Sequence, residues 1–163
     1  MAEDISISGK VQGYDGHDRK PIHMIKVAIY RDRQLVDRVY TDEEGWYMVS
    51  VPAGEPITVC FDTHASLTNA REWHPSVVAN VDATQDVLLD RVLMRVGTIS
   101  SETAAIDALA AYQFCAMWAD ADPHRGYAEH AAARLAMMKF TVGVLLDICN
   151  RLQEHFDQQA RSP

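Results

Sequence analysis

The sequence predicts an α+β protein in which a seven-stranded antiparallel β-sandwich is followed by a C-terminal α-helical hairpin. Three observations lead to this prediction. Apolar residues alternate with a period of two from Ile5 to Val96, they follow a helical period from Ser100 onward, and Gly, Pro and Asp mark the corners of the first part. We therefore divide the 163-residue chain into a sandwich domain, residues 1–97, and a helical domain, residues 98–163.

The strands of the sandwich are short and are separated by turn residues. The stretch from Gly13 to Lys20 is a turn-rich break after the first strand. Later corners are Asp42 to Gly45, where Gly supplies a backbone angle that other residues resist, and Pro52 to Gly54. The expected strands run over Ile5–Val11, Ile25–Tyr30, Leu35–Tyr40, Trp46–Val51, Ile57–Phe61, Val77–Val81 and Val87–Val96.

Two helices are expected after the sandwich. Ser100 or Ser101 is suited to the N-cap of the first helix, which should continue to about Ala119. The segment ADADPHRG then breaks the pattern, and because Gly126 disfavours a helix start, the second helix should begin nearer Tyr127. It should extend to about Gln158.

The second helix is apolar over much of its circumference. One face follows an a/d heptad pattern, with the residues Leu135, Met138, Val142, Leu145, Cys149, Leu152 and Phe156. A second apolar stripe, on another face, comprises Met137, Phe140, Val144 and Ile148. A helix of this kind needs more than one packing partner. We expect the hairpins of two subunits to form a four-helix bundle, so the chain would be a homodimer. The alternative is a monomer whose hairpin folds back onto its own sheet.

Short motifs in the first part occur in a recognisable order. They are Gly9-Lys10-Val11, then Pro21-Ile22 leading into Val27-Ala28-Ile29, then T-D-x-x-G-x-Y at Thr41 to Tyr47, then V-P-x-G at Val51 to Gly54. In this order they resemble the carboxypeptidase regulatory-like domain, over residues 5–97. The resemblance implies a prealbumin-like, or transthyretin-like, β-sandwich. It implies little about function, because this fold has many unrelated roles.

The signatures of two enzyme families that share this fold are absent from the sequence. Hydroxyisourate hydrolases end in Tyr-Arg-Gly-Ser, whereas this sandwich ends Met94-Arg95-Val96-Gly97. Intradiol dioxygenases bind iron through two tyrosines and a close histidine pair, and the chain contains no His-x-His. Since no nucleophile and base occur at a recognisable spacing either, we expect a non-enzymatic protein without a cofactor.

The long connection from Phe61 to Val78 is the main candidate binding site, because long loops on rigid scaffolds often bind ligands or partners. Its candidate contact residues are Asp62, His64, Asn69, Arg71, Trp73 and His74. The side chains of Asp62, His64 and His74 could also bind a metal ion, but we expect none there. The structural alternative is a loop that Trp73 anchors to the core.

A second set of possible metal ligands is Asp120, Asp122 and His124, between the helices. Helix capping explains these acids without an ion. A di-iron site in a helical bundle is not expected, since Glu-x-x-His is missing and the adjacent Glu129 and His130 point about 100° apart on a helix.

Charge and composition exclude other classes of function. The chain has 15 basic and 23 acidic residues, so its net charge of −8 argues against binding to nucleic acid. Its start, MAEDISIS, lacks the features of a signal peptide, and its longest apolar run is too short to span a membrane. Cys60, Cys115 and Cys149 sit in apolar sequence and resemble small buried residues, which favours a reducing cytoplasm.

These observations predict a protein-interaction or assembly module. It would dimerise through its C-terminal helices and present the sandwich loops to an unidentified partner protein. The alternative is an accessory protein that binds a small molecule or a metal through residues 61–78.

Overall fold

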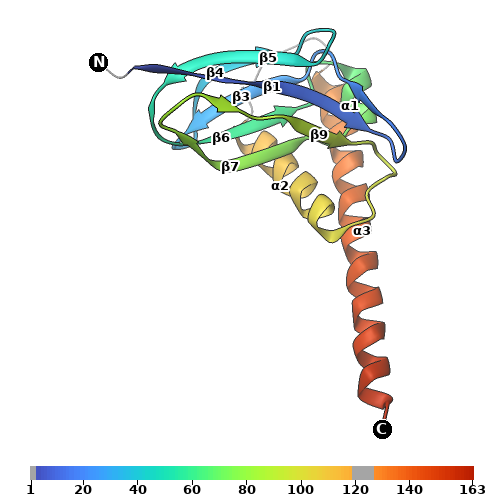
Figure 1. Ribbon diagram of the computed structural model, residues 1–163. Coiled ribbons are helices and arrows are strands. Elements are labelled where there is room, and N and C mark those ends of the chain that lie inside the picture. The colour runs from blue at the N-terminus through green and yellow to red at the C-terminus, as the bar shows by residue number, and fades with distance from the viewer. Residues whose placement is uncertain (1–2, 119–126) are drawn as a thin grey trace.

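The computed structural model of the chain describes residues 3–118 and 127–163. Two β-sheets face each other, and helices cover the outer face of one of them (Figure 1). An α+β sandwich followed by helices is therefore confirmed. Because the residues between α2 and α3 lie outside the described ranges, the candidate ligands Asp120, Asp122 and His124 do so too.

The first sheet is built around β1 (Asp4–Tyr14). On one side β1 pairs antiparallel with β5 (Trp46–Pro52) and with β2 (Arg19–Pro21). On the other side it pairs parallel with β8 (Val87–Leu88) and β9 (Arg91–Met94). Alternate residues of β1 are buried, as its period of two predicts.

The second sheet has the strand order β4-β3-β6-β7 and is antiparallel throughout. Its strands are β3 (Lys26–Arg31), β4 (Gln34–Tyr40), β6 (Gly54–Asp62) and β7 (Ser76–Ala83). β3 is buried on both faces. One face contacts the first sheet through the main core, and Ala28 and Tyr30 on the other contact the helices.

The prediction of seven antiparallel strands is wrong in two respects. The described residues form nine strands, and β8 and β9 run parallel to β1. The turn-rich break contains β2, because the chain reverses at once and pairs with the end of β1. The last expected strand is interrupted next to Gly9, where a Cβ atom would lie 2.1 Å from the carbonyl oxygen of Leu89. At this point Asp90 Oδ1 accepts a hydrogen bond from the backbone N–H of Lys10 at 2.8 Å.

The corner between β4 and β5 has the structure that its motif predicts. Asp42 Oδ1 accepts hydrogen bonds from the backbone N–H groups of Glu44 and Trp46, both at 2.9 Å. Gly45 has a φ of 81°, in the left-handed region that glycine favours. Tyr47, which ends the motif, is buried and donates a hydrogen bond to the carbonyl of Leu89 at 2.6 Å. This corner therefore aligns β5 against the last segment of the first sheet.

The loop between β6 and β7 contains a helix that the sequence did not reveal. This helix, α1 (Leu67–Glu72), is capped by Ser66, whose side chain accepts a hydrogen bond from the N–H of Asn69. Trp73 follows α1 and is buried against Gly13 of β1, where a Cβ atom would lie 2.3 Å from the indole ring. The close packing of Trp73 anchors the loop to the core.

The C-terminal helices are α2 (Glu102–Trp118) and α3 (Tyr127–Arg161). Ser101 is the cap residue of α2, because its Oγ accepts a hydrogen bond from the N–H of Ala104 at 3.2 Å. The helix α2 lies between the second sheet and the first half of α3 (Figure 1). It buries its alanines Ala105, Ala108 and Ala111. To this extent the helices fold back on their own sheet, as the monomeric alternative requires.

The second half of α3 extends beyond the rest of the protein as a single helix (Figure 1). The whole helix has 35 residues, which corresponds to about 52 Å at 1.5 Å per residue. Among the described residues, no helix combines the length and the apolar character that crossing a membrane requires.

Candidate functional site

The a/d face of α3 is largely exposed to solvent. The exposed fractions are 52% for Leu135, 48% for Val142, 44% for Leu152 and 59% for Phe156, and Cys149 is exposed as well. Its other two members, Met138 and Leu145, are half-buried against α2. We call these seven residues the α3 seam. Most of its apolar surface has no partner within the described part of the chain.

The second apolar stripe of α3 makes further contacts within the chain. Met137 and Val144 pack against a cluster on α2 that includes Tyr112. Phe140 stacks on the ring of His74, with ring centroids 5.9 Å apart and planes inclined by 22°. The stripe at Met137 holds α3 on the protein together with Met138 and Leu145, and the other five residues of the α3 seam are left exposed.

The heptad register also separates apolar and charged positions in the second half of α3. With Cys149 as an a position and Leu152 as a d position, the flanking e and g positions from 146 to 155 are Leu146, Ile148, Gln153 and His155. The acidic and basic side chains lie at the outer b, c and f positions, and one pair of them, Arg151 and Asp147, is 3.0 Å apart. Over positions 146–155, a second copy of this helix would therefore meet no like acidic or basic charge across the seam.

Asp62, the first candidate of the connecting loop, is a buried carboxylate that contacts the side chains of Arg134 and His64. Arg134 of α3 donates hydrogen bonds to its two oxygens at 2.5 and 2.7 Å. The Nδ1 atom of His64 lies 2.5 Å from Oδ2, and the backbone N–H of His64 donates to Oδ1 at 3.1 Å. These contacts tie the end of β6 to the start of α3.

The environment of Asp62 determines its protonation. Burial on its own would raise the pKa of this carboxyl group, but the hydrogen bond from His64 and the positive charge of Arg134 outweigh it. The net effect is a pKa well below the ordinary range. Asp62 is thus ionised at neutral pH.

His74 is also buried, but it does not lie beside Asp62. Its Nδ1 is 2.8 Å from the hydroxyl of Tyr112, and its Nε2 has no hydrogen-bond partner. Burial lowers the pKa of His74 to about 4, so the ring is neutral at pH 7. Because Asp62 faces Arg134 and His74 faces Tyr112, these two residues and His64 do not form a common set of metal ligands. In the described ranges, no three His, Cys, Asp or Glu side chains are grouped to hold a metal ion.

The side chains of the remaining loop candidates have different surroundings. The side-chain amide of Asn69 donates a hydrogen bond to the carbonyl of His23 at 2.7 Å, and Trp73 is buried in the core. Arg71 is exposed on α1. Of the six loop candidates, only His64 lines the cavity between the loop and the helices.

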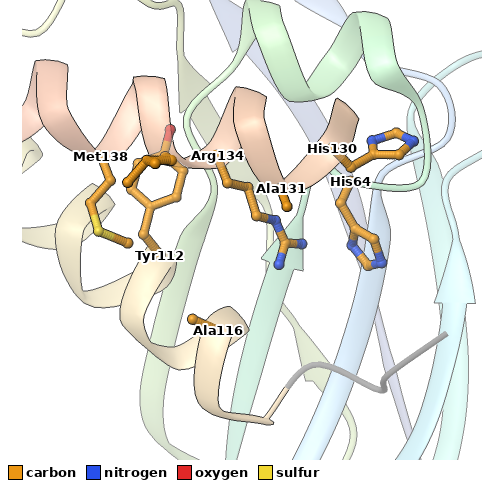
Figure 2. A pocket seen from close by; sticks show the side chains of 8 residues that line it. His64, Tyr112, Ala116, His130, Ala131, Arg134 and Met138 are labelled. Carbon is orange, nitrogen blue, oxygen red and sulfur yellow. The ribbon is translucent and has the colours of Figure 1, made fainter. Parts of the chain in front are cut away.

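This cavity has a volume of about 220 Å³ and lies between the loop and the two C-terminal helices. It is lined by His64, Tyr112, Ala116, His130, Ala131, Arg134, Leu135 and Met138. Figure 2 shows Tyr112 and Met138 at one end, the two histidines at the other, and Arg134 between them. The ring centroids of the histidines are 6.3 Å apart, and Nδ1 of His130 is buried without a partner.

The contributions of His130 and Arg134 to the cavity were not evident from the sequence. These residues are four positions apart on α3, and Met138 follows after another four, so all three share one helix face. A cation at this position, within an apolar stretch of the helix, was the available signal. It could not be paired with Asp62 from the sequence, since 72 positions separate the two residues.

Comparisons with known proteins give only distant structural likenesses. No family model matches the chain, and no curated protein matches it. Among solved structures, the minor pilin GBS52 of Streptococcus agalactiae is 12% identical, with a TM-score of 0.41. The match covers 61% of this chain and 48% of the pilin chain. A shaft pilin of Lactobacillus rhamnosus GG is 9% identical, with a TM-score of 0.37. The match covers 58% of this chain and 52% of the pilin chain.

A third structure is the 5-hydroxyisourate hydrolase of Klebsiella pneumoniae. It is 14% identical and covers 57% of this chain and 92% of its own, with a TM-score of 0.44. The chain spans about half the length of the two pilin chains. A likeness at this level assigns no activity, substrate or partner to the chain.

Proposed function

We propose that the protein is a non-enzymatic assembly module that forms a homodimer through α3. The single observation that supports this proposal best is the difference in exposure between the two apolar stripes of α3. One apolar stripe packs within the chain, while five of the seven residues of the α3 seam remain exposed on a helix that extends past the fold. In this proposal residues 1–97 form a carboxypeptidase regulatory-like sandwich, and residues 98–163 are the oligomerisation element.

A second copy of the chain is the partner that fits the α3 seam best. A heptad pattern packs against another helix with the same pattern, over a comparable length. The other long helix of the described residues, α2, is 17 residues long and already lies against the sheet. A second α3 has both the matching pattern and the length. Apolar e and g positions widen the seam, which suits a bundle of more than two helices.

A subunit-exchange experiment tests the homodimer. Tagged and untagged full-length chains are unfolded together, refolded and purified through the tag. We expect the untagged chain to co-purify when both chains are wild type, and to be lost when both carry Leu152→Lys. A wild-type mixture that returns only the tagged chain at micromolar concentration would contradict the proposal.

A second candidate function is the binding of a small molecule in the cavity. It is favoured by the buried, unpartnered Nδ1 of His130 beside the oriented ring of His64. An unpaired buried polar atom is costly, and a ligand with a matching group would satisfy it. The apolar side chains of Leu135 and Met138 would contact the body of such a ligand.

Native mass spectrometry of the full-length chain, purified without added ligands, tests this candidate. A bound small molecule would appear as a constant additional mass that disappears in His130→Ala. The matched control is His155→Ala, which removes an exposed histidine from the same helix, far from the cavity. A bare mass for the wild-type chain would count against a resident ligand, and an additional mass that both variants keep would place it elsewhere.

A further inference from the structure

Two buried cysteines from distant parts of the chain meet between the sheet and α2. Cys60 belongs to β6 and Cys115 to α2, and each is 2% exposed. Their sulfur atoms are 3.0 Å apart. Non-bonded carbon atoms stay about 3.5–4.0 Å apart and sulfur is larger, whereas a disulfide bond is about 2.05 Å long. The two sulfurs are therefore closer than an ordinary non-bonded contact, and covalent closure needs a movement of only about 1 Å.

We infer that Cys60 and Cys115 are the two ends of a disulfide that fastens α2 to the sandwich. Their surroundings are apolar, with Ala28 and Tyr30 on the sheet and Phe114 on the helix. No metal site competes for these thiols among the described residues. The expectation that all three cysteines are buried is wrong for Cys149, which is exposed on α3 and distant in sequence from this pair.

The position of the pair shows what the bond would do. The helix α2 lies between the second sheet and the first half of α3, so a bond at Cys115 fixes both helices to the sandwich. Tyr112, one turn before Cys115, lines the cavity and contacts His74. The disulfide would thus also hold one wall of the cavity in place.

The bond can form by thiol–disulfide exchange with a disulfide-bearing oxidant, such as oxidised glutathione or a thiol–disulfide oxidoreductase. One cysteine thiolate attacks the oxidant and gives a mixed disulfide, releasing one thiol of the oxidant. The second thiolate then displaces the other thiol of the oxidant. In total the two cysteines lose two protons and two electrons, and the oxidant is reduced to two thiols.

Exchange is favoured before α2 docks on the sheet. Contact with Cys60 and burial raise the pKa of the Cys115 thiol in the folded chain, and a protonated thiol is a poor nucleophile. We therefore expect the bond to close during folding, while both thiols are accessible. Such a bond favours a compartment that sustains disulfides over the reducing cytoplasm that the cysteine pattern alone suggested.

Thiol counting on the full-length chain tests the inference. The reduced protein is unfolded in guanidinium, refolded with reduced and oxidised glutathione, and denatured again in N-ethylmaleimide before its intact mass is measured. We expect one label per chain, on Cys149, and three labels when the refolded protein is reduced before labelling. Digestion without reductant should yield one cross-linked peptide pair that contains Cys60 and Cys115.

Two further measurements complete the test. In Cys115→Ser we expect the intramolecular cross-link to disappear, and Cys60 to be labelled or joined to glutathione. The wild-type protein should lose thermal stability when a reductant is added, whereas the double variant Cys60→Ala/Cys115→Ala should show no such loss. Three free thiols after oxidative refolding, or a bond that joins Cys149 instead, would overturn the inference. Because both cysteines of the proposed bond lie in one chain, the cross-linked peptide pair is expected with or without dimerisation.

Discussion

Replacing Leu152 by lysine is the sharpest perturbation of the α3 seam. The side chain is 44% exposed in the single chain, and a helix packed on the seam would cover that surface. Full burial of a leucine stabilises by about 1.5–3 kcal/mol, so the exposed part is worth about 0.7–1.3 kcal/mol per copy. Both copies lose it in a homodimer. The dimer is then weakened by about 1.3–2.6 kcal/mol, which raises its Kd roughly tenfold to hundredfold.

The assay is sedimentation equilibrium over a range of protein concentrations, with Gln158→Lys as the matched control. The control introduces the same residue and the same change in net charge on the same exposed half of α3, but at an outer position of the heptad. We expect Leu152→Lys to raise the Kd by at least tenfold, since the buried ammonium group adds a desolvation cost, and Gln158→Lys to leave it within about twofold. Equal dimer Kd values for the two variants would refute the assignment of the α3 seam as the dimer interface.

Two further predictions concern the buried groups of the loop. Arg134→Ala leaves the carboxylate of Asp62 buried without its guanidinium partner, so the free energy of unfolding should fall by about 3–5 kcal/mol in urea titrations. In the control Arg95→Ala, which breaks the exposed pair with Glu72, it should fall by less than about 1 kcal/mol, and a comparable loss in both would contradict the role of Arg134. The second prediction is a pH dependence due to His74, whose pKa is about 4 in the folded protein and about 6.5 when unfolded. Between these values the unfolded chain binds the proton and the folded chain does not, so stability should fall by about 3 kcal/mol as the pH drops from 6.5 to 4. Denaturant unfolding followed by tryptophan fluorescence should show this loss in the wild type, and the free energy of unfolding should depend less on pH in His74→Gln. The same pH dependence in both proteins would show that His74 is not the group responsible.

The regular elements could be predicted because their signals are local. The period of two in β1 and the start of α3 at Tyr127 follow from neighbouring residues alone. The parallel pairing of β8 and β9 with β1 could not be predicted in this way. It depends on contacts between residues about 80 positions apart, such as Ser6 with Asp86, whose side chain accepts the backbone hydrogen bond of Ser6.

The loop helix α1 was missed for a related reason. Six residues are too few to form a stable helix through their own propensity. Its position depends on the Ser66 cap and on the burial of Trp73 against Gly13, which is a tertiary contact. A period-based interpretation of the sequence therefore treats this segment as an irregular connection.

The candidate site was only partly accessible from the sequence. The unusual composition of residues 61–78 indicated Asp62 and His64 as candidates. Asp62 does contact the first turns of α3, and His64 contacts Asp62. Their partner Arg134 comes from the helical part of the chain, and no local pattern connects the two. Likewise, the proximity of Cys60 and Cys115 arises from how α2 docks on the sheet, which the heptad pattern of α3 does not determine.

The most direct test of the central claim is the native mass of the purified full-length chain in solution. The account predicts a species of twice the 18.2 kDa chain mass at micromolar concentration. The same species should dissociate on dilution more readily in Leu152→Lys than in Gln158→Lys. A mass of 18.2 kDa at every concentration would contradict the homodimer and leave the α3 seam without its proposed partner.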